Sequence, residues 1–234
     1  MNTLTESINL KSWLTSLANL IFPQECPGCK NPLLSDELWL CLECELKLPI
    51  APYLLHNENP ITALVKGRLK IEFGTSFMIF TKDGLAQNLI HHLKYSGRTD
   101  IGEKLGVMFA KRLIGKVQTP DAILPVPLHP NKEKIRGYNQ SWHIAKGMCK
   151  VFDIPIADSI VERIKENPSQ TKLSRYNRWE NVKDIFTSTR KHTYEYIWIV
   201  DDTLTTGSTL EACAMALLKN REIKIGIATL AYAD

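Results

Sequence analysis

Residues 197–210 constrain the fold of this chain more than any other segment. Four apolar residues, Ile197 to Val200, are followed by two aspartates, then by a turn rich in hydroxyl side chains, and then by a helical pattern that begins at Ser208. A short apolar run bounded by turn residues is typical of a buried strand, and strands that alternate with helices favour a covered parallel sheet. The segment therefore predicts an α/β fold.

The turn after this strand has the composition of an anion site. Backbone N–H groups at a helix N-terminus bind phosphate, hydroxyl side chains add donors, and glycine lets the anion approach the backbone. Asp201 and Asp202 stand where they could accept hydrogen bonds from sugar hydroxyls or hold a hydrated Mg²⁺. The simpler alternative is a helix N-cap beside two solvated carboxylates, and the spacing excludes a Walker A loop. The residues expected to bind phosphate are Thr205, Thr206, Gly207, Ser208 and Thr209.

The rest of the chain alternates strand and helix patterns in the same way. Strands are predicted at 76–81, 122–126, 159–164 and 223–230, and helices at 85–94, 139–152 and 208–219. Asp100 followed by Glu103 predicts a capping box that opens a helix to residue 116, and Ser174 predicts the cap of a short helix. A loop is expected between residues 126 and 139. This alternation predicts a mostly parallel sheet flanked by helices.

Four of the six cysteines form two C-x-x-C pairs that are separated by eleven residues. Two such pairs can present four thiolates to one tetrahedral Zn²⁺, and a site of this kind stabilises a fold without leaving a position for catalysis. Disulfides or a thioredoxin-like redox motif are the alternatives, but the strand–CxxC–helix context of that motif is missing. The other two, Cys149 and Cys213, are predicted to be buried free thiols, and a reduced, cytoplasmic protein fits best. The expected zinc ligands are Cys26, Cys29, Cys41 and Cys44.

The prolines at 49 and 52 mark the predicted end of this metal module. Residues 1–52 are expected to form an N-terminal helix and a zinc-ribbon module, and residues 53–234 the α/β domain. No run of about 18 apolar residues exists, so no transmembrane helix is expected. An amphipathic helix docked on the body is favoured over a membrane anchor for the first segment, whose apolar residues at helical spacing are Leu10, Trp13, Leu14, Leu17 and Ile21.

The formal net charge of +4 conceals an uneven distribution along the chain. Residues 91–190 hold 18 basic and 10 acidic side chains, whereas the segments before and after each carry a small acidic excess. A basic central stretch of this kind indicates that an anionic ligand binds there and not at the cysteine pairs.

These motifs resemble those of type I phosphoribosyltransferases and, within that superfamily, of the ComF family. The segments that carry the resemblance are, in chain order, the two cysteine pairs, 93–98, 125–130, 136–140 and 201–209. The resemblance spans nearly the whole chain and implies a type I phosphoribosyltransferase-like fold. Two departures stand near the last segment, since Trp198 and Thr203 replace aliphatic residues that are usual there.

The resemblance also implies ligands for particular residues. The segment 201–209 would bind 5-phosphoribosyl-1-pyrophosphate (PRPP) with Mg²⁺, with the two acids facing the ribose and the turn cradling the 5-phosphate. A pyrophosphate loop would carry Lys132, Lys134 and Arg136, although a solvated basic loop is the alternative for each lysine, and His129 is expected to be a bystander. A lid-like loop, which could also contact DNA, would carry Lys172, Arg175, Arg178 and Lys183.

Two functions follow as expectations from the resemblance. ComF proteins are associated with DNA uptake during natural transformation, which implies single-stranded DNA and proteins of the uptake machinery as partners. Aromatic residues interleave with the basic stretch and could stack on bases, although core packing is the alternative for each, and most of all for Trp142. The other expectation is an active phosphoribosyltransferase in nucleotide metabolism, for which no acceptor base or catalytic residue is identified. The aromatic residues are Tyr95, Tyr138, Trp142, Tyr176 and Trp179.

Overall fold

The computed structural model describes residues 24–165, 185–189, 192–219 and 221–233. The chain divides into two compact units, Met1–Leu48 and Pro49–Asp234. Three groups of residues treated above lie outside the described residues: the N-terminal amphipathic segment, the short helix predicted from Ser174, and the residues Lys172, Arg175, Tyr176, Arg178, Trp179 and Lys183.

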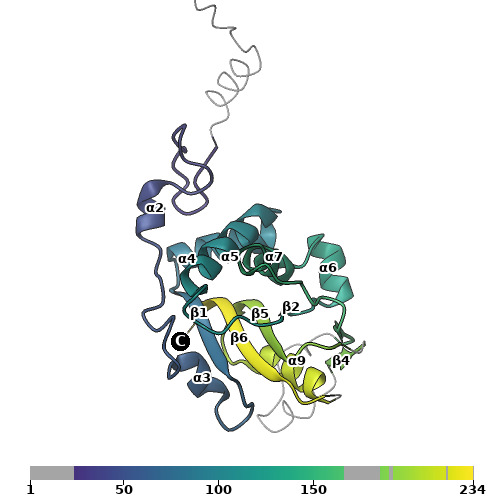
Figure 1. The fold of residues 1–234 in the computed structure, drawn as a ribbon. Coiled ribbons are helices and arrows are strands. Elements are labelled where there is room, and N and C mark those ends of the chain that lie inside the picture. The colour runs from purple at the N-terminus through teal and green to yellow at the C-terminus, as the bar shows by residue number, and fades with distance from the viewer. Residues whose placement is uncertain (1–23, 166–184, 190–191, 220, 234) are drawn as a thin grey trace, which may run out of the picture. The chain divides into compact units, whose positions relative to one another are not determined.

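A four-stranded sheet in the order β1-β6-β5-β2 forms the centre of the larger unit (Figure 1). All three strand pairs are parallel, as the alternation of strands and helices predicts. Buried apolar residues meet across the sheet in register, with Ile197 opposite both Ala122 and Ile225. The strands are β1 (Phe73–Ile79), β2 (Ala122–Pro125), β5 (Tyr196–Leu204) and β6 (Lys224–Tyr232).

Helices cover both faces of this sheet (Figure 1). On one face lie α4 (Leu85–Tyr95), α5 (Thr99–Leu113) and α7 (Gln140–Phe152). On the other face lie α3 (Pro60–Val65) and α9 (Ser208–Leu218), whose apolar residues pack against the strands in one buried cluster. The predicted α/β fold class, with a mostly parallel sheet flanked by helices, is confirmed.

Trp198 in β5 is fully buried, and the neighbouring strand makes room for it. Its indole stacks on Phe73 with ring centroids 5.0 Å apart and meets the edge of Phe152. Gly226 lies opposite it in β6, and a Cβ atom at Gly226 would stand only 2.4 Å from the indole Cδ1. The large side chain at position 198 therefore fits only because the glycine at position 226 has no side chain.

The capping box predicted at Asp100 and Glu103 is wrong. The helix begins two residues earlier than a cap at Asp100 requires, and its N-cap is Arg98, which makes no side-chain cap hydrogen bond. Asp100 instead accepts hydrogen bonds from Arg98 and Lys104. Glu103 pairs with two lysines of α7. Both carboxylates are thus held by cationic side chains and not by the backbone amides of the first turn.

The loop predicted between residues 126 and 139 is also wrong in part, because α6 (Pro130–Arg136) occupies its centre. His129 caps this helix by accepting a hydrogen bond from the amide of Asn131, and Pro130 takes the first helical position. Gly137 ends the helix with a φ of 85° in the left-handed region. These start and stop residues explain a short helix where the sequence pattern favoured a loop.

The strand predicted at 159–164 is present as β3 (Val161–Arg163), but it lies outside the central sheet. It pairs antiparallel with β4 (Phe186–Ser188) in a separate two-stranded sheet. The described part of the smaller unit holds one helix, α2 (Leu42–Leu46), and a bridge between Glu25 and Pro32. Within the described ranges, no helix combines the length and the apolar character needed to cross a membrane.

Candidate functional site

Strand β5 continues through the two aspartates and ends at Leu204, four residues later than predicted. The strand is longer because β6 pairs with it as far as Leu204. Successive side chains of a strand point to opposite faces, so Asp201 and Asp202 enter different surroundings. Asp201 is half-buried, and Asp202 is only 3% exposed.

Asp202 forms an ion pair with Lys94, in the last turn of α4. The distance from Lys94 Nζ to Asp202 Oδ1 is 2.8 Å, and the two side chains are 24% and 5% exposed. The other oxygen, Oδ2, is buried and has no hydrogen-bond partner among the described residues. A buried carboxylate oxygen without a partner is costly, so it marks a place where a hydrated cation or a hydroxyl group would fit.

Asp201 is held by a residue at the start of α7. Its Oδ1 accepts a hydrogen bond of 2.8 Å from the hydroxyl of Ser141 and another of 2.9 Å from the amide of Asp202. Burial, together with the nearby Asp202 carboxylate, raises the pKa of Asp201 to about 7. No sequence pattern indicates Ser141 as a site residue, and the motif 93–98 assigns no role to Lys94.

The turn after β5 brings the five residues expected to bind phosphate to the N-terminus of α9. Gly207 is the N-cap, with a φ of 77°, so the cap position offers no side chain to the amides of the helix. Thr205 and Thr206 are exposed, whereas Ser208 and Thr209 are half-buried. The alternative of an ordinary capped helix beside solvated carboxylates does not describe this arrangement, because the cap lacks a side-chain bond and Asp202 is buried.

Arg68 connects the turn 205–209 to the segment after α3. Its guanidinium pairs with Glu211 of α9 at 2.8 Å and reaches the carbonyl oxygen of Thr206 at 3.5 Å. It also donates to the carbonyl oxygen of Leu64. A Cβ atom at Gly207 would stand 3.3 Å from Cδ2 of Leu64, so α3 packs closely against the turn. No sequence pattern indicates Arg68 or Glu211 as part of the site.

The three basic residues predicted for the pyrophosphate loop lie on α6 and not on a loop. Lys132 and Lys134 are exposed, and Arg136 is half-buried. The Arg136 guanidinium donates to the side-chain oxygen of Gln140 and lies over the ring of Tyr95, 5.7 Å from its centroid. The cations are therefore displayed on a short helix whose C-terminal end is anchored to α4 and α7.

Tyr138 completes the link between the separate motifs. Its hydroxyl donates a 2.6 Å hydrogen bond to the carbonyl oxygen of Leu93, next to Lys94. Through Lys94 and Ser141 the segments 93–98 and 136–141 both reach the two aspartates. Segments far apart in sequence therefore meet at the carboxyl edge of the sheet, where open α/β folds usually bind ligands.

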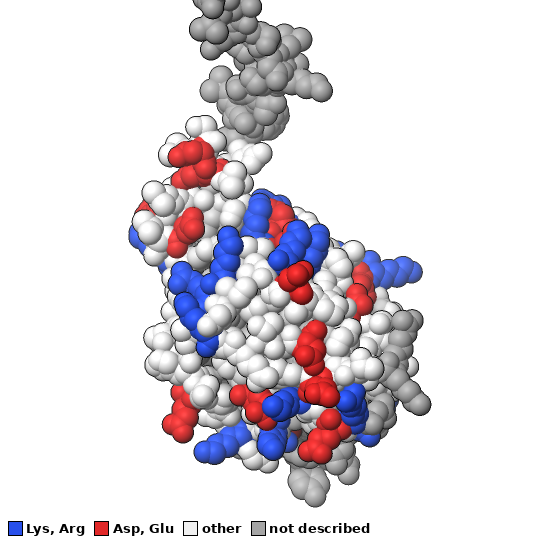
Figure 2. Space-filling view, viewed as in Figure 1, with Lys and Arg blue, Asp and Glu red and all other residues white. Residues whose placement is uncertain are grey.

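The aromatic residues of the basic stretch differ in exposure. Tyr95 is 68% exposed, and Tyr138 is half-buried. Trp142, which was expected to be the best buried of the group, is only half-buried, because its indole N–H points outward to Asp158 at 2.9 Å. On the face shown in Figure 2, basic side chains gather over α4 and α5, and charges of both signs alternate elsewhere.

The four cysteines of the smaller unit come together as a metal site requires. Their Sγ atoms all lie within 4.8 Å of one another, so the cluster could hold a metal ion. The Sγ atoms of Cys29 and Cys41 are 3.7 Å apart. In a tetrahedral zinc–thiolate site with bonds of about 2.3 Å, neighbouring sulfur atoms lie about 3.8 Å apart. A disulfide bond of about 2.0 Å does not fit this spacing, and all four thiols are free.

Backbone amides point at two of these sulfur atoms. The amide of Cys41 donates to Cys26 Sγ, and the amide of Cys44 donates to Cys41 Sγ, both at 3.4 Å. Burial alone would raise the pKa of Cys26, but amides of Cys41, Cys29 and Gly28 outweigh it and lower the pKa to about 7. Such amides stabilise a thiolate, the form that binds metal.

Comparison with known proteins finds relatives with DNA-related names. The chain is 29% identical over 212 residues to "Competence protein F" of Haemophilus influenzae, a match that covers 85% of this chain and 92% of that protein. It is 34% identical over 138 residues to "DNA utilization protein YhgH" of Escherichia coli K12. That second match covers 56% of this chain and 60% of the relative, which is less than two thirds of its length. No family model matches the chain.

Solved structures of phosphoribosyltransferases share a more distant likeness. The glutamine PRPP amidotransferase from B. subtilis, complexed with ADP and GMP, aligns with a TM-score of 0.41 and 17% identity, over 59% of this chain and 30% of that chain. The adenine phosphoribosyltransferase from Leishmania tarentolae aligns with a TM-score of 0.34 and 9% identity, over 57% of this chain and 71% of that chain.

Proposed function

We propose a function for this chain from its likeness to the ComF family, which its similarity to relatives named for competence and DNA utilization supports. It takes part in DNA uptake, binds a PRPP-type ligand at residues 201–209, and binds single-stranded DNA. The observation that carries the proposal is the convergence of Lys94, Ser141 and the turn after β5 on the two aspartates.

The phosphate of the ligand is assigned to the N-terminus of α9. Its amides have no side-chain cap, its N-cap is a glycine, and hydroxyl groups of Thr205, Thr206 and Ser208 surround it. The half-buried Asp201 is the acid that reaches the ribose. Asp202, whose Oδ2 has no partner among the described residues, would hold a hydrated Mg²⁺, which supplies positive charge to the pyrophosphate group when it is bound.

Calorimetric titration of PRPP, with and without Mg²⁺, tests this assignment. We expect saturable binding that needs Mg²⁺ and is lost in Asp201→Asn. The matched control is Asp153→Asn, because Asp153 is an exposed aspartate at the end of α7, remote from the carboxyl edge of the sheet. The absence of PRPP binding to the unaltered protein would refute the ligand assignment. Release of pyrophosphate in the presence of an acceptor would instead support the alternative function, an active phosphoribosyltransferase.

Single-stranded DNA binding is supported by the exposed cations of α6. Lys132 and Lys134 can contact phosphates, and the exposed ring of Tyr95, which Arg136 of the same helix contacts, can stack on a base. In fluorescence anisotropy with a labelled oligonucleotide, we expect binding that weakens as salt rises and weakens about tenfold or more in Lys132→Ala/Lys134→Ala. Binding that salt does not change would refute this mode of contact.

The control for this experiment removes two exposed cations elsewhere. Lys111 and Arg112 lie in the last turn of α5, which leads into the amino end of β2 and so belongs to the opposite edge of the sheet from α6. The Lys111→Ala/Arg112→Ala variant should lose much less affinity than the α6 variant. Equal losses in both variants would mean that net charge alone, and not α6, governs DNA binding.

The cofactor and location form the last part of the proposal. Structural Zn²⁺ is assigned to the four cysteines, because their spacing and free thiols suit a closed tetrahedral site. Metal analysis of the purified protein should give about one zinc per chain. A reduced thiolate site also fits a cytoplasmic location, which fractionation of the source cells would test.

A further inference from the structure

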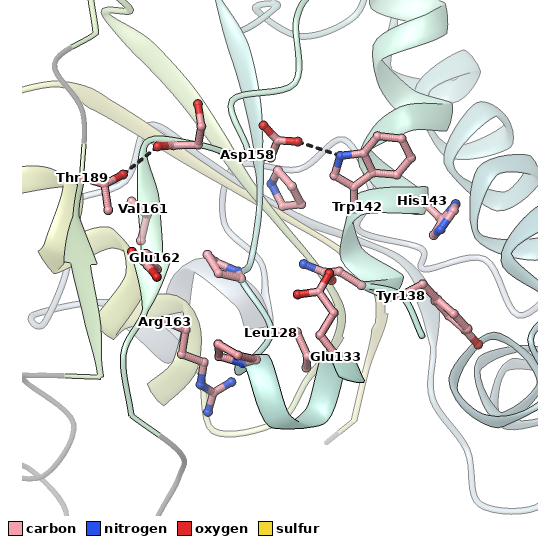
Figure 3. A pocket seen from close by; sticks show the side chains of 15 residues that line it. Leu128, Glu133, Tyr138, Trp142, His143, Asp158, Val161, Glu162, Arg163 and Thr189 are labelled. Atoms are coloured by element: carbon pink, nitrogen blue, oxygen red, sulfur yellow. Dashed lines mark hydrogen bonds between the residues drawn. The ribbon is translucent and has the colours of Figure 1, made fainter. Parts of the chain in front are cut away.

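A cavity of about 650 Å³ lies beside α6, and no residue of the segment 201–209 lines it. Figure 3 shows that α6 and the first turn of α7 form one wall, and the strand β3 forms the other. The cavity is therefore separate from the assigned phosphate turn, although the same helix α6 borders it.

Flat apolar groups supply much of the lining. Pro125, Pro127 and Pro130 contribute their rings, and Trp142 contributes its half-buried indole. The indole N–H donates to Oδ2 of Asp158 at 2.9 Å, which fixes the plane of the ring (Figure 3). A fixed aromatic plane beside small rigid rings is suited to a planar ligand.

The charged part of the lining is mainly acidic. Glu133 and Glu162 are exposed and face the cavity from opposite walls (Figure 3), and Asp158 is the third carboxylate. The described lining holds one permanent cation, Arg163, which is only 6% exposed, donates to the carbonyl oxygen of Lys165, and lies over the ring of Phe186.

His143 does not offset this negative charge. Burial, and then the neighbouring Lys146, lower its pKa, so the imidazole is neutral at pH 7. Three carboxylates therefore line the cavity beside a single guanidinium, that of Arg163, which already has partners. This lining would repel an anionic phosphate. A ligand that fits the walls is planar and directs N–H groups toward carboxylate oxygens.

Helix α6 combines this acidic wall with a basic outer surface. Glu133 lines the cavity, whereas the adjacent residues Lys132 and Lys134 are exposed. Neighbouring residues of a helix point about 100° apart, so the charges of opposite sign lie on different sides of α6. A nucleotide chain can then keep its phosphates over the lysines while one base enters the cavity.

We propose that this cavity binds one unstacked nucleobase of single-stranded DNA, and that it selects bases with an exocyclic amino group over thymine. The inference deepens the proposed DNA-binding function and depends on it. Cytosine and adenine present an amino group that donates to carboxylates, whereas thymine presents two carbonyl oxygens and a methyl group around its single N–H. The indole and the proline rings would contact the faces of the base.

Oligonucleotides of equal length test the selection, because they hold the number of phosphates constant. We expect the protein to bind a 20-residue oligodeoxycytidylate about tenfold more tightly than the thymidylate of the same length, in anisotropy at one salt concentration. In Glu133→Gln/Glu162→Gln this ratio should fall toward one. The matched control Lys132→Ala/Lys134→Ala should weaken both oligonucleotides by the same factor and preserve the ratio.

The outcomes separate this inference from the function on which it depends. Equal affinity for the two oligonucleotides would overturn the base selection and leave DNA binding intact. A preference that survives in Glu133→Gln/Glu162→Gln would overturn the cavity as its source. If neither oligonucleotide binds, the proposed DNA-binding function is wrong. Titration with the free nucleosides then tests whether the cavity binds a base. Binding of deoxycytidine but not thymidine, lost in the same variant, would support it, and any other result would overturn it.

Discussion

Lys94 Nζ lies 2.8 Å from Oδ1 of Asp202, and this ion pair joins the last turn of α4 to the carboxyl end of β5. The aspartate is almost fully buried, so its carboxylate would be costly at this position without a cation beside it. Lys94 therefore keeps in place one of the two acids that we assign to the ribose and Mg²⁺.

Replacing Lys94 by methionine tests the strength of this pair. Lys94→Met keeps the length of the side chain and leaves a buried carboxylate without a counter-ion, so we expect the free energy of unfolding to fall by about 3 kcal/mol. Lys94→Met/Asp202→Asn removes both charges and should recover much of the loss. Urea denaturation of the three proteins measures both effects. A double variant no more stable than the single one would mean that the charge pair is not the cause.

Position 226 provides a test of the packing around Trp198. A methyl group at Gly226 would stand 2.4 Å from the indole, so Gly226→Ala should lower the free energy of unfolding by about 1–3 kcal/mol or more. Trp198→Val in the same chain makes room for the methyl group, and we expect Gly226→Ala to cost much less in that background. A double-mutant cycle by thermal or urea unfolding gives the coupling energy. Additive effects would contradict direct contact as the reason.

The pair Trp198–Gly226 also marks the limit of what the sequence predicts. Local patterns located the helices 85–95 and 140–152 and the strand cores closely, because each depends on its own periodicity and caps. The partner of Trp198 stands in another strand and cannot be found by periodicity. The same reason explains the extra length of β5, which depends on its pairing with β6 as far as Leu204.

The candidate site likewise combines a part that local sequence patterns predict with contacts that only the tertiary fold creates. The turn at 205–209 and its glycine were predicted, because a strand, a glycine-rich turn and a helix follow one another in sequence. Lys94 and Ser141 were not assigned to the site, since only the tertiary fold brings them to the aspartates. Asp100 misled the prediction because its spacing to Glu103 matched a capping box, whereas in the fold nearby cations bind both acids.

The contact of Asp100 with those cations predicts a dependence of stability on pH. Hydrogen bonds from Arg98, and also from Lys104, outweigh the effect of burial and lower the pKa of Asp100 to about 2. The pKa in the unfolded chain is about 3.9, so the interaction stabilises the fold above about pH 4 and is lost as the pH falls toward 2.

Asp100→Asn should therefore differ from the unaltered protein mainly at neutral pH. The side chain is 40% exposed, so solvent weakens the pair and we expect a difference in unfolding free energy of about 1 kcal/mol or less between pH 5 and 7. The difference should shrink below pH 4. Urea titrations at several pH values measure it, and a difference that stays constant down to pH 2.5 would rule out the charge as its origin.

The cysteine cluster allows the two units to be tested separately. Cys44→Ser removes one of four ligands whose sulfur atoms lie within 4.8 Å of one another, and the buried hydroxyl is a poor substitute for a thiolate. We expect the variant to lose its zinc and the residues around the cluster to lose their protection from hydrogen exchange, because structural metal binding is coupled to folding. Protection in the sheet β1-β6-β5-β2 should stay unchanged, since the chain divides after Leu48.

Cys149→Ser is the matched control, because that thiol is buried in α7 and its replacement should leave the metal content at one per chain. Zinc retained in Cys44→Ser, or lost in Cys149→Ser, would contradict the assignment of the four ligands.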